Sequence, residues 1–279
     1  MKNILIATDF SEGSENAIRH ARKIAKIFQA KLTYFHAHYP VVPTNYLDPN
    51  GIYLSMPEID IQETLKGLEK SLNKYVQEDA KNNLQSSAVV EIGDIASGIH
   101  ALQEKHKYDL VLISKTSNTN FLEKMIGSTA KGLIHDLDIP LLVIPSNYSE
   151  DLFHKVLYAS QLEFDEIPFI QAANEWAKMG DRKLTIAHLN EEFDTDLIPD
   201  HQFLEEIKIA LKGEHVHYVN ADTKSFKAGF VKLLKDEKAS LVCMTTHKRN
   251  LLTQIVSPSK TREAIEFIPI PTLVFNVKN

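Results

Sequence analysis

Hydroxyl-bearing and glycine residues gather in residues 114–145, in a pattern that could bind a phosphate group. The stretch is SKTSNTNFLEKMIGSTAKGLIHDLDIPLLVIP. It predicts the end of a buried strand, a polar loop, a turn at Gly127-Ser128 that opens a helix, and a second buried strand. Free backbone N–H groups and the positive end of the helix dipole favour an anion at such a helix N-terminus. The stretch therefore predicts an anion-binding turn.

The same layout returns in residues 245–276, which indicates an internal repeat. The matched positions are Ser114 with Thr245, Gly127-Ser128 with Pro258-Ser259, and Ile139-Pro140 with Ile270-Pro271. Each pair is separated by the same 131 positions, as 245 minus 114 shows. A constant offset across more than thirty residues predicts duplication of one ancestral unit.

Length and composition fit two soluble domains without a disulfide. The 279 residues are 43% hydrophobic and 24% charged, with a net charge of −6, so we expect neither nucleic acid nor an anionic membrane as a partner. Residues 1–9 hold too few apolar positions for a signal peptide. The one cysteine, Cys243, cannot form an intrachain disulfide. These features predict a cytoplasmic protein.

Elements that alternate between strand and helix must position the turn. Short apolar runs predict strands, and apolar residues at helical spacing predict helices. In the first half we expect strands at 3–7, 31–37, 87–92, 109–113 and 141–144, with helices beginning near residues 11, 59 and 94. In the second half we expect strands at 155–160, 183–189, 215–219, 240–244 and 272–275, with helices at 163–179 and 226–234. This order predicts two tandem doubly wound, five-stranded parallel sheets.

The domain boundaries and the pairing of the halves follow from the repeat. The first strands are offset by 152 positions (155 minus 3) and the later ones by 131, so the second half has lost residues in its middle. We predict domains at 1–146 and 152–279. The apolar strands LLVI and TLVF would lie at sheet edges, and we expect them to pair with each other as an internal pseudo-dimer. A further homodimer of such tandem chains is an open alternative that no particular residue supports.

Together these marks resemble a tandem universal stress protein over nearly the whole chain. They are NILIATDFSE at the start, GD before the third helix, DLVLIS, GSTA and IPLLVIP. The resemblance implies an adenine nucleotide alpha hydrolase-like fold of five strands per domain, paired through the last strands. It also implies ATP binding in those members that carry G-x2-G-x9-G-[ST].

The resemblance places candidate nucleotide-binding residues in the first half. It implies that Asp9 lies near the adenine and that Ala37 contributes a backbone contact to the base. Ser114 and Ser117 stand where the motif has two glycines, whereas Gly127, Ser128 and the adjacent Thr129 remain. A serine keeps a hydroxyl but carries a Cβ, which narrows the approach of the backbone to a ligand. ATP or ADP, with Mg²⁺, is the cofactor that this half would take; the alternative is that Asp9 and Ser128 only cap helices.

The second half departs further from the motif. Gln161 replaces the aspartate, Thr245 and Lys248 replace the leading glycines, and Pro258, which has no N–H, replaces the last glycine. We expect this half to have lost the nucleotide site.

Other chemistry-bearing residues give weaker hypotheses. His36-x-His38 and His215-x-His217 provide two ligands each, whereas zinc sites use three or four, so we expect hydrogen-bonded or solvated strand histidines and no metal. Cys243 lies in an apolar strand and is expected in the core. No catalytic residue is predicted.

Three functions remain open. The first is a stress-response binding or regulatory protein, not a conventional enzyme, with weak ATP or ADP binding in the first domain. The second is a nucleotide-independent scaffold that contacts unknown protein partners through residues 39–56. The third is a slow ATP hydrolase or ATP-gated switch, which would need a base or a metal-binding carboxylate near the γ-phosphate.

Overall fold

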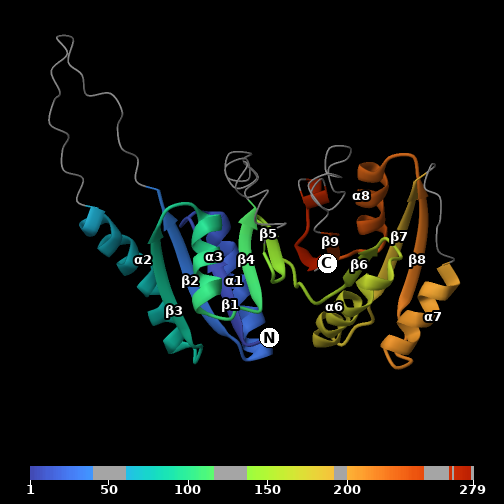
Figure 1. The fold of residues 1–279 in the computed structure, drawn as a ribbon, viewed down its shortest axis with the longest axis horizontal. Coiled ribbons are helices and arrows are strands. Elements are labelled where there is room, and N and C mark those ends of the chain that lie inside the picture. Colours follow the sequence, from blue (N-terminus) through green and yellow to red (C-terminus); the bar gives the residue numbers. More distant parts are fainter. Residues whose placement is uncertain (40–60, 116–136, 192–199, 248–263, 266, 278–279) are drawn as a thin grey trace, which may run out of the picture.

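The computed structural model describes most of the chain as alternating strands and helices (Figure 1). The described residues are 1–39, 61–115, 137–191, 200–247, 264–265 and 267–277.

The first half holds five strands and three helices in the described part. They are β1 (Asn3–Ala7), α1 (Glu12–Phe28), β2 (Lys31–His38), α2 (Ile61–Lys81), β3 (Ser86–Ile92), α3 (Ile95–Lys105), β4 (Leu110–Lys115) and β5 (Leu141–Pro145). The predicted strands are confirmed with ends that differ by one or two residues. Ser11 caps α1 and Asp94 caps α3 through their side chains.

The second half repeats this order. Its elements are β6 (Val156–Ser160), the short 3₁₀ helix η1 (Phe164–Glu166), α6 (Ile167–Met179), β7 (Thr185–Glu191), α7 (Asp200–Ala210), β8 (His217–Thr223), α8 (Phe226–Asp236), β9 (Leu241–His247) and β10 (Thr272–Val277). The predicted helix at 163–179 is thus divided into η1 and α6. Pro168, which lies in the first turn of α6, fits the rule that proline is tolerated where no intrahelical N–H bond is needed.

All the strands form one sheet with the order β3-β2-β1-β4-β5-β10-β9-β6-β7-β8. Each half has the same internal order, and its neighbouring strands are parallel. β5 and β10 are antiparallel and join the halves, with Leu142 opposite Leu273. The predicted tandem fold, paired through the last strands, is therefore confirmed, and Figure 1 shows the halves side by side about this seam.

Helices cover both faces of the sheet because its strands are apolar on both sides. Ile4 and Ile6 belong to one core with residues of α1, α2, α6 and α7, whereas Leu5 and Ala7 belong to the other core with residues of α3 and α8. Burying each leucine or isoleucine side chain of these strands contributes roughly 1.5–3 kcal/mol to stability. The described part of the chain contains no helix long and apolar enough to cross a membrane.

Polar contacts to backbone carbonyls reinforce the seam. Lys115, at the end of β4, donates from Nζ to the carbonyls of Ile265 at 2.6 Å and Ile268 at 3.4 Å in the second half. Asn276 of β10 donates from its side-chain amide to the carbonyl of Leu137 in the first half. Each half thus satisfies carbonyls that precede the last strand of the other.

Tyr148 fastens the segment between the halves to both of them. Its carbonyl accepts from the side-chain amide of Asn16 at 2.7 Å and lies 3.0 Å from Nε2 of His20. Its hydroxyl donates to the carbonyl of Ser240 at 2.9 Å. Because Nε2 of His20 faces a carbonyl, it must carry the proton, and Nδ1 is buried without a hydrogen-bond partner in the described part of the structure.

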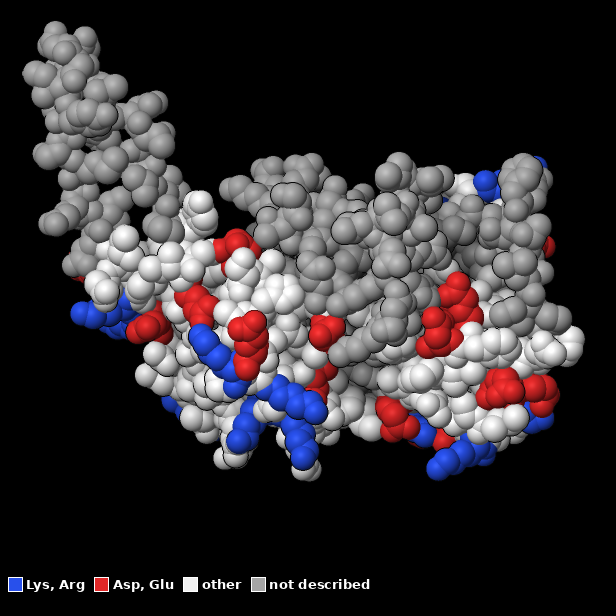
Figure 2. Space-filling view, viewed as in Figure 1, with Lys and Arg blue, Asp and Glu red and all other residues white. Residues whose placement is uncertain are grey.

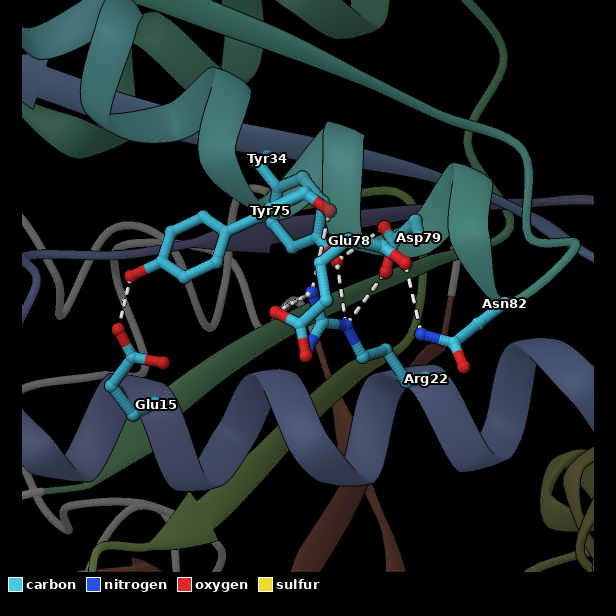
Figure 3. A network of polar contacts seen from close by, with 7 residues as sticks. All are labelled: Glu15, Arg22, Tyr34, Tyr75, Glu78, Asp79 and Asn82. Atoms are coloured by element: carbon cyan, nitrogen blue, oxygen red, sulfur yellow. Dashed lines mark hydrogen bonds and ion pairs between the residues drawn. The ribbon is translucent and has the colours of Figure 1, made fainter.

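A buried charge network joins α1, β2 and α2 in the first half (Figure 3). The fully buried carboxylate of Asp79 accepts from Nε of Arg22 at 2.7 Å and from the hydroxyl of Tyr34 at 2.7 Å. Arg22 also pairs with Glu78 at 3.0 Å, and Tyr75 donates to Glu15. Burial, followed by the hydrogen bond to Asp79, raises the pKa of Tyr34, so its hydroxyl remains a donor.

Replacing Asp79 by alanine should destabilise the protein strongly, because Arg22 and Tyr34 then lose a buried acceptor. We expect Asp79→Ala to lower the free energy of unfolding by about 3–5 kcal/mol in urea denaturation. Glu78→Ala is the matched control, since Glu78 pairs with the same arginine but its side chain is 57% exposed; it should cost less than about 1 kcal/mol. Equal stability of the two variants would contradict this role for Asp79.

The contact between His20 and Tyr148 should contribute less to the stability of the fold in acid. Burial, with nearby Lys23 and Arg19, lowers the pKa of His20 against the opposing effects of the Tyr148 carbonyl and Asp151. The unfolded chain, with a histidine pKa near about 6.5, then binds the proton more readily than the folded chain. The stability that His20 contributes is present above about pH 6.5 and is lost as the pH falls below it.

Thermal denaturation between pH 7.5 and pH 5 measures this effect. Glu, Asp and other His residues also titrate in this range, so the relevant quantity is the difference between wild type and His20→Gln. The variant should show a flatter loss of Tm with falling pH, because glutamine can donate to Tyr148 without titrating. If Tm falls equally with pH in wild type and His20→Gln, His20 does not contribute to the loss of stability in acid.

Candidate functional site

The strand order places the expected ligand site above the ends of β1 and β4. The chain runs from β1 outward to β2 and β3, and then returns to place β4 and β5 on the other side of β1. Ligands of open α/β sheets bind at such a reversal, outside the carboxyl ends of the strands. Asp9 follows β1, Ala37 lies near the end of β2, and Ser114 lies near the end of β4. The fold therefore brings these three predicted positions to one sheet edge, whereas Ser117, Gly127, Ser128 and Thr129 lie outside the described residues.

Asp9 organises the turn between β1 and α1. Its Oδ1 accepts from the backbone N–H of Ser11 at 3.1 Å and from the Ser11 hydroxyl at 2.6 Å. Ser11 in turn accepts from the N–H of Ser14 at 3.3 Å and is the N-cap of α1. The alternative that Asp9 itself caps this helix is wrong, because the carboxylate holds the cap residue instead. Phe10 adopts a positive φ of 62°, which makes room for this tight turn.

Three rings, those of Phe10, His36 and His38, lie close together near the turn of Asp9 and the end of β2. The ring of Phe10 lies 4.8 Å from that of His36, and His36 lies 6.4 Å from His38. Nδ1 of His36 is 2.8 Å from the carbonyl of Thr8, so this nitrogen carries a proton and the ring is fixed in orientation. His36 is therefore a hydrogen-bonded strand histidine, as expected. Ala37 lies between the two histidines in the sequence of β2.

Ser114 provides a buried hydroxyl on the β4 side of the site. The residue is 2% exposed, and its Oγ has no hydrogen-bond partner in the part of the chain that the structure describes. A buried polar group left unpaired costs roughly 1–3 kcal/mol, so such groups are rare unless a ligand, ion or water satisfies them. The adjacent Lys115 reaches into the second half. Ser114 thus stands out among the residues at this edge as a group suited to a ligand.

A buried carboxylate lies at the equivalent strand ends of the second half. Glu166 is fully buried and accepts from Ser160 Oγ at 2.6 Å and from Thr245 Oγ1 at 2.9 Å. The backbone N–H groups of Gln161 at 3.0 Å and Glu163 at 3.3 Å also donate to it. Burial raises the pKa of Glu166, against the opposing effect of these hydrogen bonds. Lys248, Pro258 and Ser259 lie outside the described residues.

Sequence reasoning missed Glu166, although a signal was present. The offset of 152 positions that aligns the first strands also aligns Ser14 with Glu166 and His36 with His188. His188 repeats the contact of His36, with Nδ1 at 2.9 Å from the Ser160 carbonyl. An acidic residue where the first half has a buried serine would have indicated a different polar interior.

The thiol of Cys243 and the possible metal ligands show no reactive or metal-binding arrangement in the described part of the chain. Cys243 is buried in β9, and burial raises its pKa, so its thiol is not poised as a nucleophile. Among the described residues, no group of three or more His, Cys, Asp and Glu side chains could hold a metal ion.

Comparisons of the sequence with known proteins point to one family. The model described as the universal stress protein family matches residues 1–145. Universal stress protein MJ0531 of Methanocaldococcus jannaschii is 30% identical over 146 residues, which cover 51% of this chain and 81% of that protein. Universal stress protein A of Escherichia coli (strain K12) is 25% identical over 155 residues, which cover 54% of this chain and 98% of that protein.

Solved structures match the whole chain. A universal stress protein from Archaeoglobus fulgidus superposes with a TM-score of 0.74 at 19% identity, covering 99% of this chain and 98% of its own. Protein PA1789 from Pseudomonas aeruginosa gives a TM-score of 0.70 at 13% identity, covering 99% and 93%. At these identities the likeness shows the fold alone, and it extends over both halves.

Proposed function

The chain belongs to the universal stress protein family, and we propose that its first domain binds an adenine nucleotide while its second domain is mainly structural. We take the domains as residues 1–146 and 152–279. The nucleotide would lie over the reversal between β1 and β4, where Asp9 and Ser114 flank the gap between the two strand ends. Mg²⁺ would accompany ATP or ADP through its phosphates.

The observation that carries this proposal is the buried hydroxyl of Ser114 without a partner. A ribose hydroxyl or a phosphate oxygen is a natural acceptor for it, and its position on β4 faces the edge where α/β sheets hold ligands. The carboxylate of Asp9, fixed by Ser11, supplies an acceptor for an exocyclic amine at the base end. The backbone at Ala37, beside His36, supplies the base contact that the family resemblance implies.

The phosphate end would be formed by residues that follow β4. Ser117, Gly127, Ser128 and Thr129 are assigned to it by their match to the family motif. Two serines replace glycines there, and each adds a Cβ between the backbone and the ligand. We therefore propose weak binding, and a regulatory rather than catalytic role in a cytosolic stress response.

A second candidate function is docking of a protein partner near residues 39–56. Tyr39 is 73% exposed and Ile92, opposite His38 in the sheet, is 55% exposed, so two large apolar side chains stand at the end of β2 and β3. A pull-down with and without residues 40–56 tests this function. Capture of the same proteins by both forms would contradict it.

Mg-ATP and Mg-ADP should stabilise the protein against heat and bind with one nucleotide per chain in calorimetry. We expect one nucleotide per chain because the proposed binding residues occur in the first domain and not in the second. No change of Tm at millimolar nucleotide would overturn the proposal. Release of phosphate from radiolabelled ATP by the purified protein would instead favour a slow hydrolase.

Ser114→Ala should weaken nucleotide binding by about five- to tenfold, since one hydrogen bond of roughly 1 kcal/mol is lost. The free protein should lose no stability, because the hydroxyl has no partner to lose. Thr185→Val is the matched control, as Thr185 Oγ1 is also buried and unpaired in the described structure but lies in β7 of the other half. The control should bind nucleotide like the wild type. An unchanged Kd in Ser114→Ala would exclude Ser114 from the site.

A further inference from the structure

Glu166 connects three parts of the second half at its strand edge. Ser160 ends β6, Gln161 and Glu163 form the turn that follows, and Thr245 lies on β9. All four donate hydrogen bonds to this one carboxylate, over distances of 2.6 to 3.3 Å. Three donors converge on Oε2 and one on Oε1, and the side chain is fully buried. The arrangement is a preformed nest for a carboxylate.

The same positions form the candidate site in the first half. By the offsets of 152 and 131 positions, Ser160 corresponds to Thr8, Gln161 to Asp9, and Thr245 to Ser114. The nest of the second half is therefore built from the counterparts of the residues that flank the proposed nucleotide site.

The first half has a shorter side chain at the central position. Ser14 accepts from the hydroxyl of Thr8 at 2.9 Å and donates to the carbonyl of Ser11 at 2.9 Å. It makes no hydrogen bond with Ser114, whose hydroxyl stays without a partner in the described structure. Thr245 thus has an acceptor from its own half, whereas its counterpart Ser114 has none among the described residues.

We propose that the carboxylate of Glu166 is a built-in occupant of the second ligand edge, which closes that edge and holds its strands together without any ligand. The first half, with Ser14 at this position, keeps its edge open for a ligand atom. This second statement rests on the proposed nucleotide binding of the first half, whereas the statement about Glu166 does not.

Removal of the carboxylate should expose the nest to a small carboxylate from solution. Glu166→Ala takes from the four donor groups the acceptor that they share, and we expect Tm to fall by about 5–10 °C. Sodium formate at 100 mM should restore a large part of this loss, because a formate ion offers the same two oxygens in the space that the side chain leaves. Sodium chloride at equal ionic strength should not restore it, and neither salt should act on the wild type in this way.

Glu166→Gln is the matched variant, since it keeps the shape and one acceptor oxygen. It should retain most of the stability and show no response to formate. A Glu166→Ala protein as stable as the wild type, or one that formate and chloride stabilise equally, would overturn the proposal.

If the Glu166→Ala protein does not fold, a second measurement tests the same proposal. Thr245→Val removes a single donor to the carboxylate, and hydrogen exchange of the Gln161 and Glu163 amides then reports on the turn. We expect faster exchange of both amides than in the Thr185→Val control. Equal exchange in the two variants would show that the carboxylate does not tie β9 to the turn, and would contradict the proposal.

Ser14→Glu places a carboxylate at the position of the first half that corresponds to Glu166. Its carboxylate should accept from Ser114 and weaken the binding of Mg-ATP at least tenfold, whereas Ser14→Ala, which adds no carboxylate, should bind close to wild type. Unchanged binding by Ser14→Glu would contradict the inference for the first half. Absence of binding by the wild type itself would overturn the proposed function, and the formate experiment would still decide the role of Glu166.

Discussion

The antiparallel pairing of β5 with β10 is the constraint on which the rest of the molecule depends. Each half alone would expose the edge of an apolar strand, which invites association with other chains. Pairing the two edges within one chain removes both from water and gives a single ten-stranded sheet. Lys115 and Asn276 then satisfy carbonyls across the seam, and Tyr148 fastens the connecting segment to both halves. The two halves are consequently parts of one packed structure.

The two halves share the same packing of helices on strands but differ in their buried polar groups. Gly98 and Gly229, 131 positions apart, both lie where a helix approaches a strand closely: a Cβ would come within 2.4 Å of Phe35 in one half and of Thr223 in the other. The polar interiors have changed. In the first half the buried ion pair of Arg22 and Asp79 joins α1 to α2, and the Ser114 hydroxyl at the strand edge has no hydrogen-bond partner among the described residues. The second half places its buried charge, Glu166, at the strand edge itself.

Much of the fold could be predicted from the sequence because buried parallel strands are short apolar runs and the repeat supplies an independent check on each. The seam was also predictable, since LLVI and TLVF are apolar strands expected at sheet edges, and such edges favour pairing. Element ends were less certain, as η1 shows within the predicted helix at 163–179. The strand-edge positions of Asp9, Ala37 and Ser114 followed from their places after strands. The role of Glu166 did not, because its contact with Thr245 joins residues 79 positions apart in the sequence. The three other donors lie within six positions of Glu166, but only the alignment with Ser14 marks the acidic residue as a change of the polar interior.

The central claim is that one copy keeps an open strand edge for an adenine nucleotide and the other closes its edge with its own side chain. Titration of ¹⁵N-labelled protein with Mg-ATP, followed by amide chemical shifts, tests it most directly. The account predicts saturable shifts at Asp9, Ala37 and Ser114, with the amides of Gln161, Glu163 and Thr245 unmoved. Shifts confined to the second set, or no saturable shift in either, would contradict it.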